Sequence, residues 1–483
     1  MTRPLRVAII HYHLRPGGVT RVIGHAAAAL QKSAVRLVVL SGTPVADIAA
    51  VPAPCVNVPD LAYTSVSDRA PARLAEQLLA TATSALGAPP DLLHIHNHSL
   101  GKNLAFTSAV YILAERGQRL LLQIHDFPED GRPDNYRVLR RALAADAPLC
   151  LGAQLYPLAP HVHYAALNQR DTDFLRKTGM DAAQLHLLPN PVALESGPPS
   201  RADDTPLWIY PTRAIRRKNL GEFILWAALA EPDEHFAVTL APTTPSERVR
   251  YDDWVHFVTQ HQLPVEFEAG KKDPAPLVTL LQHARYLCTT SVAEGFGLAF
   301  LEAALVGRPL LGRDLPEITQ DLKACGLRLD NLYERLVVPQ DWIGTDTLRT
   351  TIATAYTRSM AAYGRALSPA DIERAFTAAI TPTGVDFGRL DEPLQQQVIR
   401  RVCQDKAAWA LLRQQRRLPV SADNIAHNQR VITEHFSVAG YGKRLAELYS
   451  AVADSEPAPL RAGDAGSLLD QFLQPERFFL LRT

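Results

Sequence analysis

The 483-residue sequence has few cysteines and no pattern among them. Its five cysteines lie far apart without a Cys-x-x-Cys pair, and an odd, scattered set argues against a disulfide framework or a zinc site. Nowhere do about eighteen apolar residues run together, as a membrane-spanning helix requires. The first eleven residues contain a single short apolar run, well below the length of a signal-peptide core. These absences predict a cytoplasmic protein.

The sequence also has no excess of charge of either sign. Lysine plus arginine and aspartate plus glutamate number 50 each, so the formal net charge is +0. A chain without a global basic field has no electrostatic reason to bind nucleic acid. The hydrophobic content of 47% is ordinary for a globular protein. The length is sufficient for several domains with substantial cores.

Buried strands alternate with amphipathic helices from the N-terminus onward. Residues 5–11 are mostly apolar, and a turn with Gly17 and Gly18 leads to apolar residues at helical spacing over 19–30. Residues 35–40 read as the next strand. This order predicts an α/β domain with a parallel sheet. The dinucleotide-binding Gly-x-Gly-x-x-Gly is missing, and a tight entry into the helix is by itself a sufficient reason for both glycines.

A polar stretch over 195–206 separates two such α/β regions. It is rich in Ser, Gly, Pro, Asp and Arg and has no apolar periodicity, which is the composition of an interdomain linker. We therefore expect a Rossmann-like domain over 1–195, a second over 206–385, and a helical C-terminal extension over 386–483. The two doubly wound domains are expected to face each other across a cleft at the linker.

The strongest candidate site lies in residues 291–302, where a short strand leads through a glycine turn into an apolar helix. Glycines at the turn let a ligand approach the backbone, and a helix start suits a phosphate. An unpaired carboxylate in such a helix is costly, so Glu302 needs a partner. With Glu294 in the turn, two acids could hold a sugar and a ribose on either side of that phosphate. The alternative is a buried helix whose Glu302 pairs with an arginine.

A second candidate is a group of cations between the strand at 207–210 and the next helix. Arg213, Arg216, Arg217 and Lys218 lie within this turn of an otherwise neutral protein. Arginine binds phosphate through two hydrogen bonds and lysine acts as a point charge. A solvated basic turn is the alternative. The candidate site some eighty residues further along favours phosphate binding.

Three histidines alternate along the strand predicted at 91–98. His94, His96 and His98 would share one face, but strand neighbours point in parallel, so a metal site is disfavoured. Another buried strand, at 120–124, runs into His125 and Asp126. Polar residues at the carboxyl ends of such strands are site candidates, although Asp126 could equally cap a helix.

These motifs resemble family 4 retaining glycosyltransferases, which have the two-domain B-type fold. The resemblance rests on Glu294-x₇-Glu302 with Glu-Gly-Phe-Gly-Leu at its start, and on Arg213-x₄-Lys218. It covers most of residues 1–450. It implies that Glu294 lies beside the donor sugar and that Glu302 holds the ribose hydroxyls. Arg213 and Lys218 would bind the diphosphate. Donor-binding positions carried over from the family are Gly17, Gly18, Arg213, Lys218, Gly295, Phe296, Gly297, Leu298 and Glu302.

The resemblance also implies roles for the N-terminal loops. His125 would lie beneath the donor sugar as a catalytic residue with Arg213, Lys218 and Glu294. The acceptor pocket would include His96, His98 and Asp126. No metal and no further cofactor is implied. The expected partners are a UDP-, GDP- or ADP-sugar donor and a carbohydrate or small-molecule acceptor.

The reaction implied is transfer of a hexose with retention of configuration, by attack from the leaving-group face. Two alternatives remain: a sugar phosphorylase of the same fold, and a non-catalytic nucleotide-sugar-binding regulator. The acceptor and the nucleotide base are not encoded in a motif.

The C-terminal region is largely helical. A basic amphipathic segment over 393–417 could contact an anionic membrane, but packing on its own protein is the favoured interpretation. The Pro-, Ala- and Gly-rich stretch over 455–466 predicts a mobile segment. The family's last helix crosses back onto the first domain, and residues 428–449 resemble that helix pair.

Overall fold

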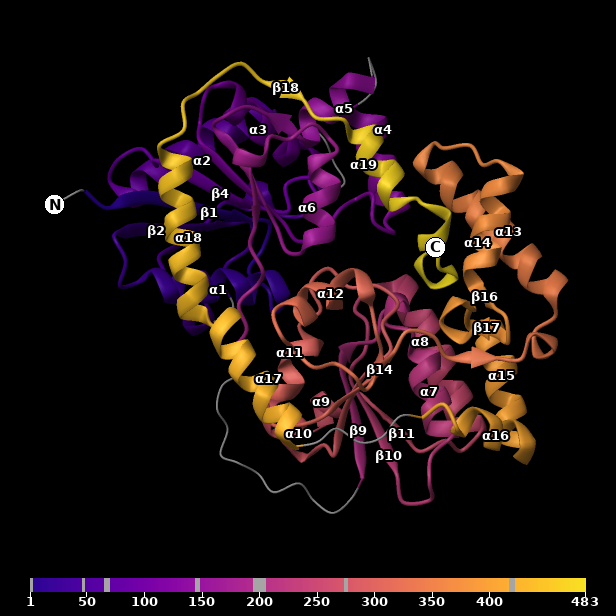
Figure 1. Ribbon diagram of the computed structural model, residues 1–483. Coiled ribbons are helices and arrows are strands. Elements are labelled where there is room, and N and C mark those ends of the chain that lie inside the picture. The colour runs from indigo at the N-terminus through magenta and orange to yellow at the C-terminus, as the bar shows by residue number, and fades with distance from the viewer. Residues whose placement is uncertain are drawn as a thin grey trace. The chain divides into compact units, whose positions relative to one another are not determined.

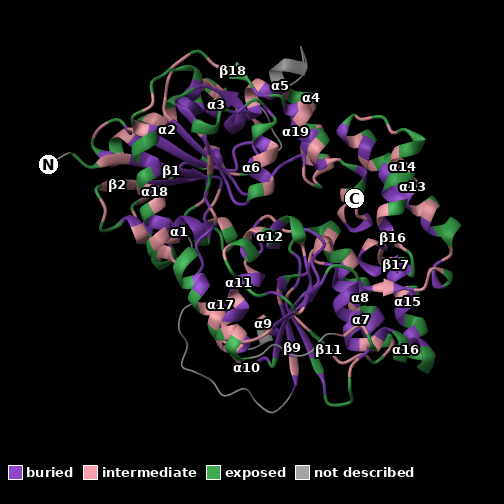
Figure 2. Cartoon of the chain, viewed as in Figure 1, coloured by how far each residue is buried: buried purple, intermediate pink, exposed green. Residues whose placement is uncertain are grey.

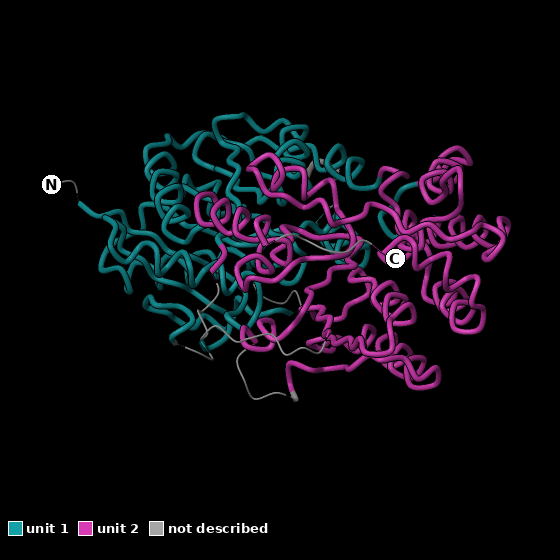
Figure 3. The backbone as a smooth tube through the Cα atoms, turned by 60° about the horizontal axis from the view of Figure 1, so that its bottom comes forward, with its two compact units in different colours: residues 1–191, 362–365, 436–473 teal, residues 192–361, 366–435, 474–483 magenta. Residues whose placement is uncertain are grey.

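The computed structural model describes residues 3–45, 48–64, 70–143, 148–193, 206–272, 277–416 and 422–483. Apart from Pro206, the expected linker at 195–206 lies outside the described residues. The chain divides into two compact units, coloured separately in Figure 3. Unit 1 comprises Met1–Pro191, Ala362–Arg365 and Phe436–Leu473, and unit 2 comprises Val192–Ala361, Ala366–His435 and Gln474–Thr483.

Unit 1 is built on a seven-stranded sheet of order β3-β2-β1-β4-β5-β7-β8, whose neighbours pair in parallel (Figure 1). Apolar runs make the central strands buried on both faces, as is typical of parallel sheets (Figure 2). The strands are β1 (Leu5–His11), β2 (Val35–Ser41), β3 (Cys55–Asn57), β4 (Leu92–His96), β5 (Leu120–Ile124), β7 (Val162–Ala166) and β8 (Leu185–Leu187).

Helices cover both faces of this sheet. On one face α1 (Gly18–Leu30) packs with α18 (Val438–Ala453) in a common apolar core. The other face is covered by α2 (Pro71–Leu86), α3 (Leu104–Glu115), α4 (Pro133–Leu143), α5 (Pro148–Leu155), α6 (Gln169–Arg176) and α19 (Ala465–Phe472). Helix α18, from the C-terminal part of the chain, therefore belongs to the same unit as the N-terminal residues.

Two sequence expectations for unit 1 are wrong. The strand predicted over 91–98 ends at His96, because Asn97 adopts a left-handed conformation with φ 57°. The stretch over 455–466 is ordered rather than mobile. In it β18 (Arg461–Ala462) pairs antiparallel with β6 (Pro157–Leu158), and the Arg119 guanidinium donates to the Ser455 carbonyl at 2.8 Å.

Unit 2 contains a six-stranded parallel sheet of order β11-β10-β9-β12-β13-β14. The strands are β9 (Leu207–Arg213), β10 (His235–Leu240), β11 (Val265–Phe267), β12 (Tyr286–Thr289), β13 (Leu310–Arg313) and β14 (Leu332–Tyr333). The helices between them are α7 (Leu220–Ala228), α8 (Pro245–Gln260), α9 (Ala269–Lys272), α10 (Leu277–His283), α11 (Ala299–Leu305) and α12 (Pro316–Ala324). The expectation of two doubly wound α/β units is confirmed.

The remaining elements of the chain are mainly helical. They are β15 (Val337–Val338), α13 (Thr345–Tyr363), α14 (Pro369–Ala379), β16 (Ile380–Thr381), β17 (Gly384–Asp386), α15 (Glu392–Gln404), α16 (Lys406–Arg413) and α17 (Ala422–His435). The basic segment belongs to unit 2 and packs within it, where Arg413 donates to the Leu229 carbonyl at 2.8 Å and Arg416 donates to Glu234 at 2.6 Å. Among the described residues, no helix is both long and apolar enough to cross a membrane.

A buried ion network fixes the start of α7 in unit 2. Arg313 donates to Glu222 at 3.0 Å and to Asp386 at 2.8 Å, and all three side chains are almost completely buried. Asn219, left-handed with φ 52°, donates to Glu222 at 2.8 Å and accepts from Gln395 at the same distance. This network holds the residue that directly follows Lys218.

Candidate functional site

The two sheets reverse their strand order at a central pair of neighbours. In unit 2 these are β9 and β12, and in unit 1 they are β1 and β4. Ligands of open α/β sheets bind beyond the carboxyl ends of the strands at such a point. The cationic stretch 213–218 begins at the last residue of β9, and the glycine turn with Glu294 follows β12. The topology therefore explains why residues about eighty positions apart meet.

Lys218 and Glu294 form an ion pair in unit 2. The Lys218 ammonium donates to Glu294 Oε1, and Arg217 donates to Glu294 Oε2 at 3.0 Å. Burial alone would raise the pKa of Glu294, but Lys218 and Arg217 hold that pKa at about 2. Burial lowers the pKa of Lys218, and Glu294 opposes that shift. Glu294 is thus ionised at neutral pH and cannot serve as a general acid.

Neutral side chains of unit 2 fix this pair. Ser291 donates to Glu294 Oε1 at 2.6 Å, and the Tyr210 hydroxyl lies 2.8 Å from the Ser291 hydroxyl and donates to the Lys218 carbonyl at 3.0 Å. Thr290 also donates to the Lys218 carbonyl, at 3.1 Å. The sequence analysis named Arg217 among the cations of the turn and included Ser291 in the candidate stretch 291–302, but gave neither an individual role. It missed Tyr210 and Thr290, for which the sequence offers no signal.

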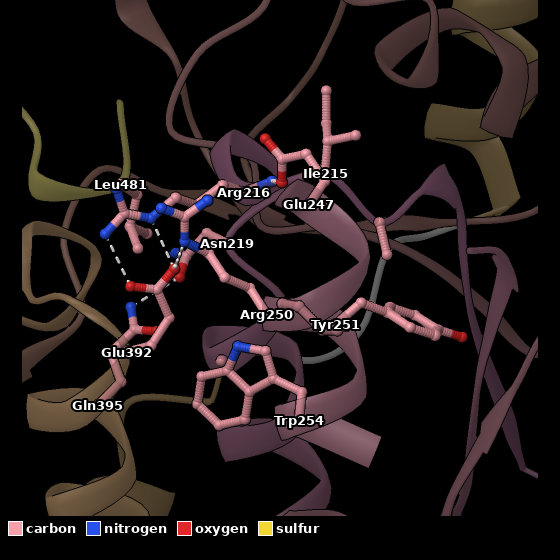
Figure 4. Close-up of a pocket in the computed structure, with 13 residues that line it drawn as sticks. Ile215, Arg216, Asn219, Glu247, Arg250, Tyr251, Trp254, Glu392, Gln395 and Leu481 are labelled. Atoms are coloured by element: carbon pink, nitrogen blue, oxygen red, sulfur yellow. Dashed lines mark hydrogen bonds and ion pairs between the residues drawn. The ribbon is translucent and has the colours of Figure 1, made fainter. Parts of the chain in front are cut away.

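The other two cations of the turn point elsewhere. Arg213 donates to the Ala241 carbonyl at 3.1 Å, so in unit 2 the structure brings Lys218, but not Arg213, onto Glu294. Arg216 donates twice to Glu392, at 2.6 and 2.8 Å (Figure 4), and outside that view it also donates to Thr483. It lines a small pocket with Trp254. Arg216 therefore has a structural role. The arginine beside the Glu294 carboxylate is Arg217 and not Arg213.

The glycine turn requires glycine at Gly297. Its φ is 82°, and an added Cβ would lie 2.5 Å from the ring of Phe300. Gly295, Phe296 and Leu298 lie in the same turn, and α11 begins directly after it. Glu302, in the first turn of α11, raises the pKa of Lys218 through its charge and therefore lies near it. The predicted Glu302, Glu294 and Lys218 thus gather within unit 2.

In unit 1, His96 and His125 form a stacked, hydrogen-bonded pair. Their rings are 5.1 Å apart at 17°, and His96 Nδ1 lies 2.8 Å from His125 Nε2. Burial lowers the pKa of His125 to about 4 and that of His96 well below its usual range, so both are neutral at pH 7. His94 instead contacts Tyr449 of α18, 2.8 Å from its hydroxyl.

The two other residues predicted for an acceptor pocket lie in the loops that follow β4 and β5. His98 is fully buried, with Nε2 2.8 Å from the Leu155 carbonyl. Asp126 forms an ion pair with Arg132. The side chain of Asn97 accepts from the amides of His125 and Asp126, at 2.7 and 3.1 Å. Asn97, which sequence reasoning overlooked, therefore ties the two loops together.

Gly17 and Gly18 are exposed at the start of α1, Gly17 as its N-cap and Gly18 as its first residue. A Cβ added at Gly18 would meet nothing within 4 Å, and one at Gly17 would meet only the Arg15 carbonyl, at 3.8 Å. Packing within unit 1 therefore does not require these glycines. No group of three or more His, Cys, Asp or Glu residues within the described ranges is placed to hold a metal ion.

One characterised relative is similar to the chain in sequence. Mannosylglucosyl-3-phosphoglycerate synthase of Petrotoga mobilis is 28% identical over 264 residues, which are 50% of this chain and 50% of the relative. The chain thus matches about half the length of that relative. No protein-family model matches the chain.

Solved structures match nearly the whole chain in fold. Anabaena HepE in complex with UDP and glucose has a TM-score of 0.54 and 14% identity, covering 92% of this chain and 99% of HepE. Sucrose-phosphate synthase from Thermosynechococcus elongatus has a TM-score of 0.52 and 16% identity, covering 93% and 98%. At such identities the likeness concerns the fold, which is that of B-type glycosyltransferases.

Proposed function

We propose that this chain, which has the B-type glycosyltransferase fold and is similar to family 4 enzymes, transfers a hexose from a nucleotide sugar to a carbohydrate or small-molecule acceptor. The observation that carries the proposal is the ion pair of Lys218 with Glu294, joined by Arg217, at the point where the unit 2 sheet reverses its strand order. Ligands of open α/β sheets bind at such points, and arginine and lysine there favour a phosphate ligand.

The cations would stabilise the leaving diphosphate. As the sugar–phosphate bond breaks, negative charge grows on the diphosphate, and preorganised cations lower the free energy of that state. Glu294 binds the side chains of Lys218 and Arg217, and Tyr210 and Thr290 donate to the Lys218 carbonyl, so the cations are held in place by the protein. Arg213 is close in sequence and could reach the diphosphate after leaving the Ala241 carbonyl. With these charges supplied by the protein, we propose that the transfer is independent of metal.

Retention of configuration would follow from attack on the face of the leaving group. Glu294 stays ionised at neutral pH and is already paired with two cations. It is therefore unsuited to protonate a leaving group, and an oxygen of the diphosphate takes the proton of the acceptor. The carboxylate of Glu294 instead orients the cations and the donor sugar.

We propose a UDP-sugar, with UDP-glucose as the first donor to test, because HepE was solved with UDP and glucose. Glu302 would bind the ribose hydroxyls, and the turn at Gly295, Phe296, Gly297 and Leu298 would approach the nucleotide. In unit 1, Gly17, Gly18 and His125 are proposed to contact the donor. His96, His98 and Asp126 would shape the acceptor pocket, with His96 and His98 acting through the loops they support.

A thermal-shift screen with UDP-, GDP- and ADP-sugars tests the proposal, because a ligand that binds only the folded state raises the melting temperature. We expect one nucleotide class to stabilise the protein and Glu302→Ala to abolish that stabilisation. Glu434→Gln, an exposed acid on α17, is the matched control. A shift that is unchanged in Glu302→Ala refutes the ribose assignment, and no shift with any nucleotide refutes the donor site.

A further inference from the structure

Tyr63 of unit 1 lies at the centre of a group of basic side chains at the carboxyl ends of β1 and β4. The residue is 46% exposed, and its ring lies 5.0 Å from the ring of His13 and 5.1 Å from that of Tyr12. The Lys102 ammonium lies 5.9 Å from the centre of the Tyr63 ring. A cation at this distance from an aromatic face is attracted only weakly. The ring therefore places the ammonium without neutralising it.

Lys102 is the informative member of this group. It is half-buried, and burial together with the nearby guanidinium of Arg132 lowers the pKa of its ammonium. Within the described ranges, no carboxylate pairs with it. A partly desolvated ammonium without a counter-charge costs free energy that a bound anion would recover.

Two arginines extend the positive charge around Tyr63. Burial, helped by the charge of Asp126, raises the pKa of the Tyr63 hydroxyl, and the charges of Arg132 and Arg15 oppose that shift. Arg132 forms an ion pair with Asp126, whereas the Arg15 guanidinium is exposed and has no acid partner in the described part of the chain. Among the residues that the structure describes, Arg132 is thus paired with Asp126, whereas Lys102 and Arg15 have no carboxylate partner.

We propose that the acceptor carries an anionic group, a phosphate monoester or a carboxylate, bound by Lys102 and Arg15 beside Tyr63. This inference rests on the proposed function, because it names the chemical class of the acceptor. Arginine suits a planar or tetrahedral oxyanion through paired hydrogen bonds, and lysine adds a point charge. Asp126, next to His125, would keep the remaining cation, Arg132, in place.

Matched acceptor pairs test the proposal. Transfer from the donor identified in the screen is measured with glucose 6-phosphate against glucose, and with glucuronate against glucose, in the wild type, Lys102→Met, Arg15→Ala and the exposed control Lys32→Met. We expect anionic acceptors to be preferred. The KM for the anionic acceptor should rise about tenfold or more in Lys102→Met and Arg15→Ala, and stay unchanged in Lys32→Met. A preference for the neutral acceptors, or an unchanged KM in both variants, overturns the proposal.

Separate measurements distinguish this inference from the proposed function and identify the source of the anion. If no donor is consumed with any acceptor, the proposed function fails, and calorimetric titration of glucose 6-phosphate still decides this inference. Binding lost in Lys102→Met supports an anion site, and no binding to the wild type overturns it. Co-sedimentation with phosphatidylglycerol vesicles that Lys102→Met abolishes would assign the anion to a lipid headgroup. Binding of soluble glucose 6-phosphate alone assigns it to a free metabolite.

Discussion

Replacing Glu294 with glutamine tests whether this carboxylate holds the cations of unit 2. The pKa of Glu294 is about 2 in the folded protein against its ordinary 4.5. A carboxyl group with a lowered folded pKa stabilises the fold at pH values above its ordinary pKa, and that contribution is lost as the pH falls from 4.5 toward 2. The difference is worth roughly 3 kcal/mol at pH 7. Glu294→Gln should cost about that much, because Lys218 and Arg217 are then left facing each other.

Tryptophan fluorescence during urea unfolding is a suitable assay. All five tryptophans, Trp208, Trp226, Trp254, Trp342 and Trp409, belong to unit 2, so the signal reports that unit alone. The control Glu434→Gln should change the free energy of unfolding by less than about 0.5 kcal/mol. A double-mutant cycle with Lys218→Met isolates the pair, and we expect a coupling of about 1–3 kcal/mol.

The reasoning would be refuted by a coupling free energy near zero. It would also be refuted if Glu294→Gln were as stable as the control at pH 7. Either result would mean that the ion pair is screened or broken in solution. The cationic turn would then be an ordinary solvated surface.

Two further predictions concern stability and pH dependence. Arg313→Met leaves two buried carboxylates without their cation, so the free energy of unfolding of unit 2 should fall by about 3–5 kcal/mol in the same fluorescence assay; a loss below about 1 kcal/mol would contradict the network. The pKa of His125 is about 4, so its imidazole is neutral above that pH. If kcat/KM of the wild type has an inflection near pH 6.5, that inflection should therefore persist in His125→Asn. An inflection near pH 6.5 that disappears in His125→Asn would mean that His125 takes up a proton near neutrality and would contradict the prediction.

Much of the fold follows from the sequence because buried parallel strands are continuous apolar runs. The same logic located α1, whose observed bounds Gly18–Leu30 agree with the helical spacing of apolar residues over 19–30. The local pattern placed the end of β4 wrongly, because the single left-handed residue Asn97 ends the strand without changing the alternation of side chains in the sequence. It failed again over 455–466, because composition does not record pairing with a distant edge such as β6.

The candidate site was predictable in part. The contact of Lys218 with Glu294 follows from motif spacing together with the topology of an open α/β sheet. Which arginine of the turn meets the carboxylate did not follow, because rotation about the turn decides between Arg213 and Arg217. The supporting hydroxyls of Ser291 and Tyr210 depend on tertiary contact across residues 81 positions apart.

Turnover of UDP-glucose by the wild type and by Lys218→Met tests the central claim most directly. Phosphorus NMR follows release of UDP, and the configuration of the transferred sugar is read from the proton spectrum. We predict consumption of the sugar nucleotide by the wild type with a retained configuration, and a rate about 10²–10³ lower in Lys218→Met. No consumption of a UDP-, GDP- or ADP-sugar, or an equal rate in the variant, would contradict it.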